Sequence, residues 1–260
     1  MPSDFRLDHD LPLPHLRTLC QLWLWAAMLA GLGVAALAID APLAAWVHNG
    51  NSPSPLNKVC GLSEAMGHGM GVLLIAIVMA TLDPSNRHRL PRILVAALGS
   101  GLLANICKLA LARTRPNHFE FHLQSSLDSF GPWLPMLGNP SWNQGFPSSH
   151  AATAAGLAIV LSCIYPRGRV LFPVLAVLAG MQRVLEEAHF ASDVFWGAAV
   201  GCAFAPLCVY GSALGRLLDR LEERLMGVVH GRSGPGHGGQ PSLNCPGDAR
   251  SDSQQRPRAA

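Results

Sequence analysis

Long apolar runs constrain the fold of this 260-residue chain more than any other feature of its sequence. Half of the residues are hydrophobic and only 13% are charged. A helix of about 20 apolar residues crosses the ~30 Å hydrocarbon layer of a bilayer and satisfies its own backbone hydrogen bonds there. The sequence therefore predicts an all-α, polytopic membrane protein with its spans in a single domain.

About six transmembrane helices are predicted, separated by loops at residues 40–63 and 117–146 among others. The expected spans are residues 19–39, 65–82, 91–109, 147–164, 170–185 and 194–214. Residues 1–17 are polar and form an N-terminal segment, and residues 18–225 form the membrane domain. Residues 226–260 are rich in Gly, Ser, Pro and Arg, a composition that predicts a disordered tail.

The distribution of basic residues predicts the orientation, because short cytoplasmic loops carry an excess of Lys and Arg. One side of the predicted topology holds ten arginines: Arg6, Arg17, Arg87, Arg89, Arg92, Arg167, Arg169, Arg216, Arg220 and Arg224. The other side holds Lys58, Lys108, Arg113, Arg115 and Arg183. Both termini are therefore expected in the cytoplasm. The basic residues are scattered, so nucleic acid is not an expected partner.

Three short motifs fall on the predicted outer face. Residues 108–116 read K-x6-R-P, residues 147–150 read P-S-x-H, and residues 183–193 read R-x5-H-x3-D. Lys108, Arg115 and Arg183 supply cations that suit the oxygens of a phosphoryl group. Ser148 and Ser149 open a predicted helix, where unpaired backbone N–H groups can receive an anion, although simple N-capping is the alternative.

The order and spacing of these motifs resemble the type 2 phosphatidic acid phosphatase and vanadium haloperoxidase superfamily over roughly residues 56–212. The resemblance implies a membrane-embedded lipid phosphatase that hydrolyses a phosphomonoester or pyrophosphate without a metal or other cofactor. It assigns His189 as the nucleophile that forms a phosphohistidine, with Asp193 to orient and support its imidazole. It assigns His150 as general acid and base, and a bacterial inner membrane with the site facing the periplasm is the expected location.

The chain departs from the family pattern in places. Ser149 replaces a usual glycine, and Gln182 replaces a usual serine. Glu186 and Glu187 add acids near the expected phosphate, where one of them could pair with an arginine or contact a cationic part of the substrate.

Two further groupings leave alternatives open. Glu64 and His68 share a predicted helix face. They are either a functional pair of ionisable residues in the membrane or the partners of a structural hydrogen bond. His118 and His122 have helical spacing but no further ligands in sequence, so no metal site is predicted.

The sequence leaves three rival functions to weigh. A lipid phosphotransferase would pass the phosphoryl group from the same histidine to an alcohol. A vanadium haloperoxidase has similar ligands, but members with that activity are soluble. A non-enzymatic lipid-binding protein would not need His150, His189 and Asp193 together. The expected substrates are phosphatidate, phosphatidylglycerol phosphate, polyprenyl diphosphate or lipid A, and the oligomeric state is not predicted.

Overall fold

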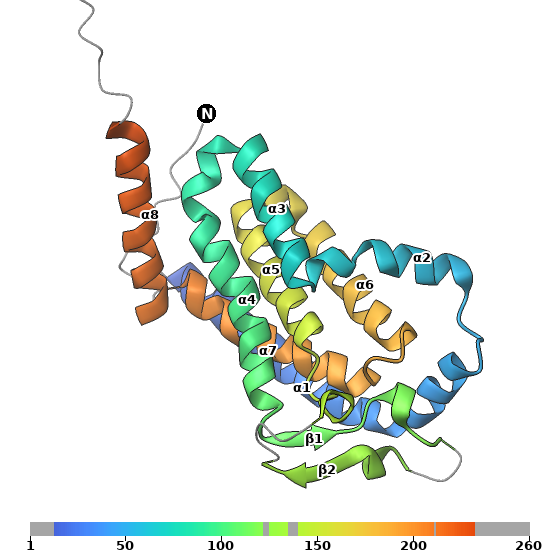
Figure 1. Ribbon diagram of the computed structural model, residues 1–260. Coiled ribbons are helices and arrows are strands. Elements are labelled where there is room, and N and C mark those ends of the chain that lie inside the picture. Colours follow the sequence, from blue (N-terminus) through green and yellow to red (C-terminus); the bar gives the residue numbers. More distant parts are fainter. Residues whose placement is uncertain (1–12, 122–124, 135–139, 211, 232–260) are drawn as a thin grey trace, which may run out of the picture.

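The computed structural model describes residues 13–121, 125–134, 140–210 and 212–231, and helices dominate it (Figure 1). The α-helices are α1 (Leu13–His48), α2 (Ser54–Leu62), α3 (Gly69–Leu82), α4 (Leu90–Cys107), α5 (Ser149–Ile164), α6 (Leu171–Leu185), α7 (Ala191–Val209) and α8 (Ala213–Gly231). Short 3-10 helices lie between them, including η1 (Glu64–Met66), η2 (Pro84–Arg89) and η7 (Pro166–Gly168). The predicted all-α class is confirmed.

The six predicted spans each fall on an apolar helix. Among the described residues, three stretches are long and apolar enough to cross a bilayer alone: Leu19–His48, Pro84–Cys107 and Ala191–Val209. A fourth crossing is possible where Ser54–Met66 and Gly69–Leu82 meet at a bend of 70°. Helices α5 and α6 are shorter apolar helices. The chain is an integral membrane protein.

The boundaries of two predicted segments were wrong. Helix α1 continues through Asp40 to His48, so the first part of the expected 40–63 loop is helical. Asp40 does not end the helix because its buried carboxylate is neutralised by Arg113. The last span ends at Val209 rather than at residue 214, and a separate helix, α8, follows. Residues 226–231 of the expected tail belong to α8, whereas residues 1–12 and 232–260 lie outside the described residues.

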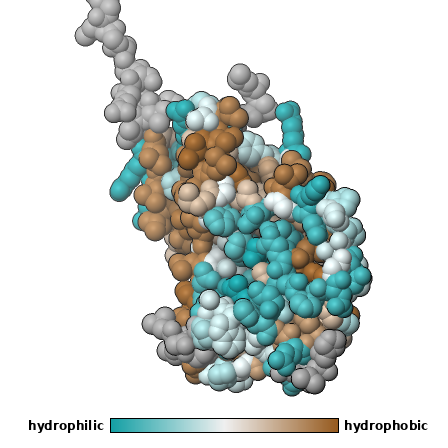
Figure 2. Space-filling view, turned by 45° about the vertical axis from the view of Figure 1, so that its right-hand side comes forward, coloured by the Kyte–Doolittle hydropathy of each residue, from teal (hydrophilic) through white to brown (hydrophobic). Residues whose placement is uncertain are grey.

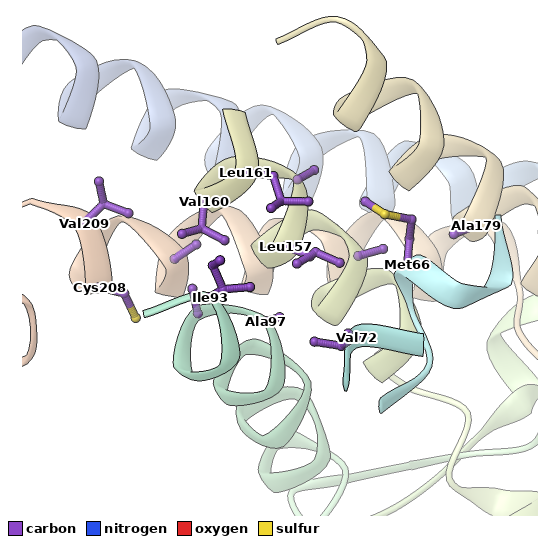
Figure 3. Close-up of a cluster of buried hydrophobic side chains, with 14 of the residues drawn as sticks. Met66, Val72, Ile93, Ala97, Leu157, Val160, Leu161, Ala179, Cys208 and Val209 are labelled. Carbon is purple, nitrogen blue, oxygen red and sulfur yellow. The ribbon is translucent and has the colours of Figure 1, made fainter. Parts of the chain in front are cut away.

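Helix α5 is the centre of the bundle, and its side chains from Ala151 to Ala158 are all buried. Small residues let its neighbours approach closely. A Cβ at Gly156 of α5 would meet the Ser100 hydroxyl of α4. A Cβ at Gly201 of α7 would meet the Ala152 carbonyl of α5. Side chains such as Ile93, Leu157 and Val160 fill the space that remains (Figure 3). Close backbone approach through small residues is typical of packing inside a membrane.

A small antiparallel sheet lies beside one end of the bundle (Figure 1). Strand β1 (Leu111–Arg113) follows α4, and it pairs with β2 (Phe130–Trp133) from the expected 117–146 loop. The Gly145 N–H donates to the Arg113 carbonyl at 2.8 Å, which ties the segment before α5 to β1. Figure 2 shows hydrophilic side chains gathered over the lower half of the molecule, on the side where the sheet lies. This end of the bundle is polar, and it carries all three sequence motifs.

Candidate active site

The three motifs converge where the ends of four helices meet. Lys108 caps the C-terminus of α4, and Arg115 follows β1. Ser148, Ser149 and His150 begin α5. The remaining residues are Arg183 in the last turn of α6, His189 in the connection to α7, and Asp193 in the first turn of α7. Electrostatic interactions link Lys108 with Arg115, Arg183 and Asp193, and link His150 with Arg183, His189 and Lys108. The structure thus brings the sequence-predicted set together.

The cations are concentrated in a largely buried space. Lys108 is 7% exposed, and its ammonium lies 3.4 Å from the Ser149 hydroxyl. Burial, together with repulsion from Arg115 and Arg183, lowers the pKa of Lys108 to about 8. Burial and the neighbouring Arg183 likewise lower the pKa of Arg115. Like charges held this close favour the binding of an anion that compensates them.

Both motif arginines present an unsatisfied donor. Among the described residues, the buried side-chain atoms without a hydrogen-bond partner are Nε of Arg115 and Nε of Arg183. A buried N–H without a partner costs about 1–3 kcal/mol, so such donors indicate a ligand site. An Arg183 terminal nitrogen donates to Glu186 at 2.7 Å and to Gln182 at 3.3 Å. Those two contacts hold the guanidinium in place and leave its Nε for a further acceptor.

Ser148 is the N-cap of α5 and is fully buried. Its hydroxyl accepts from the Ala151 N–H at 3.4 Å, and its own N–H donates to the Asp193 carbonyl at 3.0 Å. The capping alternative therefore describes the Ser148 side chain in this structure. Ser149, one residue on, is the serine that reaches the Lys108 ammonium.

The imidazole of His189 is 2% exposed, and its Nδ1 lies 2.7 Å from the carbonyl oxygen of Gly145. A carbonyl only accepts, so Nδ1 carries the proton and Nε2 keeps its lone pair. Burial is the largest influence on His189 and lowers its pKa, although Asp193 opposes this shift. A neutral ring with a free Nε2 has the form that a nucleophile requires.

Asp193 lies close to that imidazole, one helical turn along the chain as its spacing predicted. Its nearer carboxylate oxygen lies 3.8 Å from Nδ1 of His189. The same oxygen accepts from the Phe190 N–H at 2.8 Å, and the other oxygen pairs with Arg113. Because Asp193 caps α7 and binds Arg113, Gly145 is left to fix the tautomer. The neighbouring Asp193 raises the pKa of His189, against the larger effect of burial.

Arg113 is the residue that the motif analysis missed. Its guanidinium is fully buried and binds Asp193, Asp40 at 2.7 Å and the hydroxyl of Ser192 at 2.6 Å. Phe130 and Phe190 also flank it, with ring centroids 4.4 and 4.5 Å from the guanidinium carbon.

Asp40 completes this cluster from α1. One of its oxygens accepts from the Ser192 N–H at 3.0 Å, and the carboxylate is 1% exposed. The sequence offers one signal for Asp40, because it is a single acid directly after the apolar run of residues 19–39. Acids within membrane segments are functional candidates by default. We call Asp40, Arg113, Asp193 and Ser192 the buried arginine cluster.

The region around His150 contains the bend between η1 and α3. The His68 ring lies 5.8 Å from the His150 ring, and a Cβ at Gly67 would meet the His150 carbonyl at 2.8 Å. His68 itself caps α3 by accepting from the Met70 N–H at 3.2 Å. The bend therefore brings a second imidazole beside the predicted acid and base.

Each of the two additional glutamates has a partner within the chain. Glu186 pairs with Arg183, which was one of the two alternatives from sequence. Glu187 pairs with His48 from the end of α1 at 2.8 Å and has a positive φ of 53°. No cluster of three or more His, Cys, Asp or Glu side chains that could hold a metal occurs among the described residues. His122 lies outside that part of the chain.

Comparison with known proteins identifies the class to which this fold and site belong. Residues 89–214 match the model of the PAP2 superfamily. A lipid A 1-phosphatase from Rhizobium johnstonii is 30% identical over 201 residues, which cover 71% of this chain and 78% of that protein. The chain therefore belongs to the PAP2 superfamily, as its motifs indicated.

Two further relatives have related names. A lipid A 1-phosphatase from Rhizobium etli is 37% identical over 122 residues, covering 47% of this chain and 50% of that protein. A crystal structure of a transmembrane PAP2 type phosphatidylglycerolphosphate phosphatase from Bacillus subtilis aligns with a TM-score of 0.48 and 19% identity. That alignment covers 80% of this chain and 96% of the other.

The lowered pKa of Lys108 predicts how phosphate binding depends on pH. Lys108 is cationic below about pH 8 and neutral above it, so affinity for inorganic phosphate should fall at higher pH, by about tenfold per unit well above pH 8. Lys108→Arg should remove most of this fall, because arginine stays charged throughout. Lys58→Arg, at the only other lysine of the chain, is the matched control and should keep it. Calorimetric titration between pH 7 and 10 measures the effect. If the affinity of Lys108→Arg for phosphate still fell at high pH, the titration of another group would be responsible.

Proposed function

We propose that the protein is a phosphatase that hydrolyses a phosphomonoester or pyrophosphate on a lipid through a phosphohistidine at His189, without a metal. The observation that carries the proposal is the pair of buried, unpartnered Nε donors on Arg115 and Arg183, next to Lys108 and a neutral His189. Three side-chain cations can balance the oxygens of a phosphoryl group. They supply by themselves the charge that phosphoryl transfer needs.

The first step transfers the phosphoryl group to the enzyme. Nε2 of His189 attacks phosphorus, an N–P bond forms, and the P–O bond to the leaving group breaks. The imidazole gains positive charge as it attacks, and Asp193, 3.8 Å away, stabilises that charge. Gly145 holds the Nδ1 proton throughout. His150 donates a proton to the leaving oxygen, which makes the lipid a better leaving group.

The second step releases phosphate. His150, now neutral, accepts a proton from water as the water oxygen attacks phosphorus. The N–P bond breaks, and its electron pair returns to Nε2 of His189. The proton then remains on His150 for the next cycle. If an alcohol attacked in place of water, the phosphoryl group of the same intermediate would pass to that alcohol, and the enzyme would be a phosphotransferase.

A lipid substrate agrees with the position of the site at one end of a membrane bundle. Large apolar side chains such as Leu73, Ile77 and Leu102 are exposed on α3 and α4, where they face the acyl region in a bilayer. A substrate tail can lie in that region while its phosphate meets the cations at the interface. The two Rhizobium relatives are lipid A 1-phosphatases, so a glycolipid phosphate is the first substrate to test.

Phosphate release by the purified protein tests the function, with lipid A, phosphatidate, phosphatidylglycerol phosphate and a polyprenyl diphosphate as substrates. Turnover should persist in EDTA, and vanadate should block it. Rapid quench with labelled lipid should trap label on the wild type and none on His189→Ala. His150→Ala should slow turnover most where the leaving alkoxide is poor. Dependence on added magnesium, or label trapped only on His189→Ala, would contradict the scheme.

Asp40 is expected to position and balance the site without touching substrate. Asp40→Asn removes one charge from the buried arginine cluster, which leaves Arg113 to compete more strongly for Asp193. We expect kcat to fall about tenfold or more with a smaller change in KM. Less negative charge near His189 lowers its pKa further, so the acid limb of the pH–rate profile should move to lower pH.

Asp83→Asn is the matched control for Asp40→Asn. Asp83 is also a hydrogen-bonded acid, but it ends α3 at the far end of the bundle, where Tyr165 donates to it at 2.9 Å. This control should alter thermal stability alone. If both variants lose stability equally and keep the wild-type pH profile, Asp40 has only a structural role.

The proposed location is a bacterial inner membrane, with both termini in the cytoplasm and the site facing the periplasm. The uneven distribution of arginines supports this orientation. Alkaline phosphatase fused after Leu134 should be active, since it would reach the periplasm. A fusion after Arg89 should be inactive, while a reporter that needs the cytoplasm should give the opposite pattern. Activity of the Arg89 fusion alone would place the site in the cytoplasm.

A further inference from the structure

Helix α8 has two surfaces that the rest of the bundle does not cover. Its docked side is formed by Leu218, which is 2% exposed, and Glu222, which is 6% exposed. On an adjacent stripe, at helical spacing, Leu217, Leu221 and Leu225 are 53%, 39% and 42% exposed. Arg216, Arg220 and Arg224 follow one another at intervals of four residues and are all exposed. On a helical wheel, the arginine stripe borders the leucine stripe.

The docking of α8 depends on one buried cation. Arg92, near the start of α4, is 4% exposed and pairs with both Glu222 at 2.6 Å and Asp219. These are two of the three acids between Ala213 and Gly231. The third acid, Glu223, lies with the three arginines among the exposed residues of α8. The exposed side of α8 is therefore basic, although the helix taken alone has as many acids as arginines.

The place of α8 in the fold puts this basic side at a membrane surface. Arg92 and Lys108 are at opposite ends of α4, about 24 Å apart for 16 residues of helix. Lys108 belongs to the phosphate-binding end, so α8 lies at the other end of the bundle (Figure 1). Arg167 and Arg169, in or beside η7, add positive charge at the end of the bundle away from the site.

We propose that α8 is an interfacial helix that binds anionic phospholipids in the leaflet opposite the phosphate site. The leucine stripe enters the acyl boundary, and Arg216, Arg220 and Arg224 contact lipid phosphates. An amphipathic helix with a basic face beside its apolar face binds in this way. The charge complementarity selects anionic lipid over a second copy of the chain, whose α8 would present the same arginines. This inference does not depend on the phosphatase activity.

Hydrogen exchange of the full chain in nanodiscs tests the proposal. Amides of residues 217–226 should exchange about tenfold more slowly in discs containing phosphatidylglycerol than in pure phosphatidylcholine, at low salt. Arg220→Gln/Arg224→Gln should abolish the difference, and so should 0.5 M salt. Arg167→Gln/Arg169→Gln removes the same amount of charge outside α8. This variant should retain most of the difference in exchange between the two kinds of disc. Leu217→Ser/Leu221→Ser should speed exchange in both kinds of disc.

Three outcomes would overturn the proposal. Equal protection in both lipids and in Arg220→Gln/Arg224→Gln would mean that Arg92 and the bundle alone hold α8. Protection that follows the number of chains per disc, independent of lipid charge, would mean that the leucine stripe contacts a second copy. If Arg167→Gln/Arg169→Gln lost the lipid-dependent protection as fully as Arg220→Gln/Arg224→Gln, the protection would come from the positive charge of the whole surface and not from α8.

Discussion

The site depends on a fully buried arginine that is neutralised by two acids. Arg113 stays charged in any environment, so burying it requires acids close by. Asp40 comes from α1 and Asp193 from α7, while Phe130 and Phe190 cover the faces of the guanidinium. These contacts fix where α7 begins. The start of α7 in turn fixes His189, because Asp193 caps the helix at Phe190. Removing Arg113 would leave two carboxylates buried without their cation.

The buried arginine cluster has a net negative charge and lies next to His189. One arginine and two carboxylates leave a single negative charge, and Asp193 of this cluster lies 3.8 Å from Nδ1 of His189. In the proposed reaction, the three cations favour the incoming phosphate, while the residual negative charge favours the imidazole once it becomes cationic. The carbonyl oxygen of Gly145 lies 2.7 Å from Nδ1 of His189, and the Asp193 carboxylate lies 3.8 Å from it.

The sequence was sufficient for the all-α class, the positions of the apolar helices and the family, because each depends on local composition or motif spacing. It could also place Lys108, Arg115, Arg183, His150 and His189 at one end, since alternate helix ends share a membrane face. The contributions of Asp40 and Gly145 could not be found in this way. Asp40 meets Arg113 across 73 residues of sequence, and Gly145 acts through a backbone carbonyl that has no sequence signature. Long-range ion pairs and backbone acceptors appear only once the chain is folded.

A second buried arginine repeats the same solution at the opposite end of the bundle. Arg92 is held by Asp219 and Glu222, as Arg113 is held by Asp40 and Asp193. In both places an outer helix, α1 or α8, supplies an acid to a buried arginine, which belongs to β1 at one end and to α4 at the other. The apolar middle of the bundle offers little to fix the register of these outer helices, because leucine packs against lipid and protein about equally well. Ion pairs at the two ends supply that register, and in each place one buried arginine is shared by two acids.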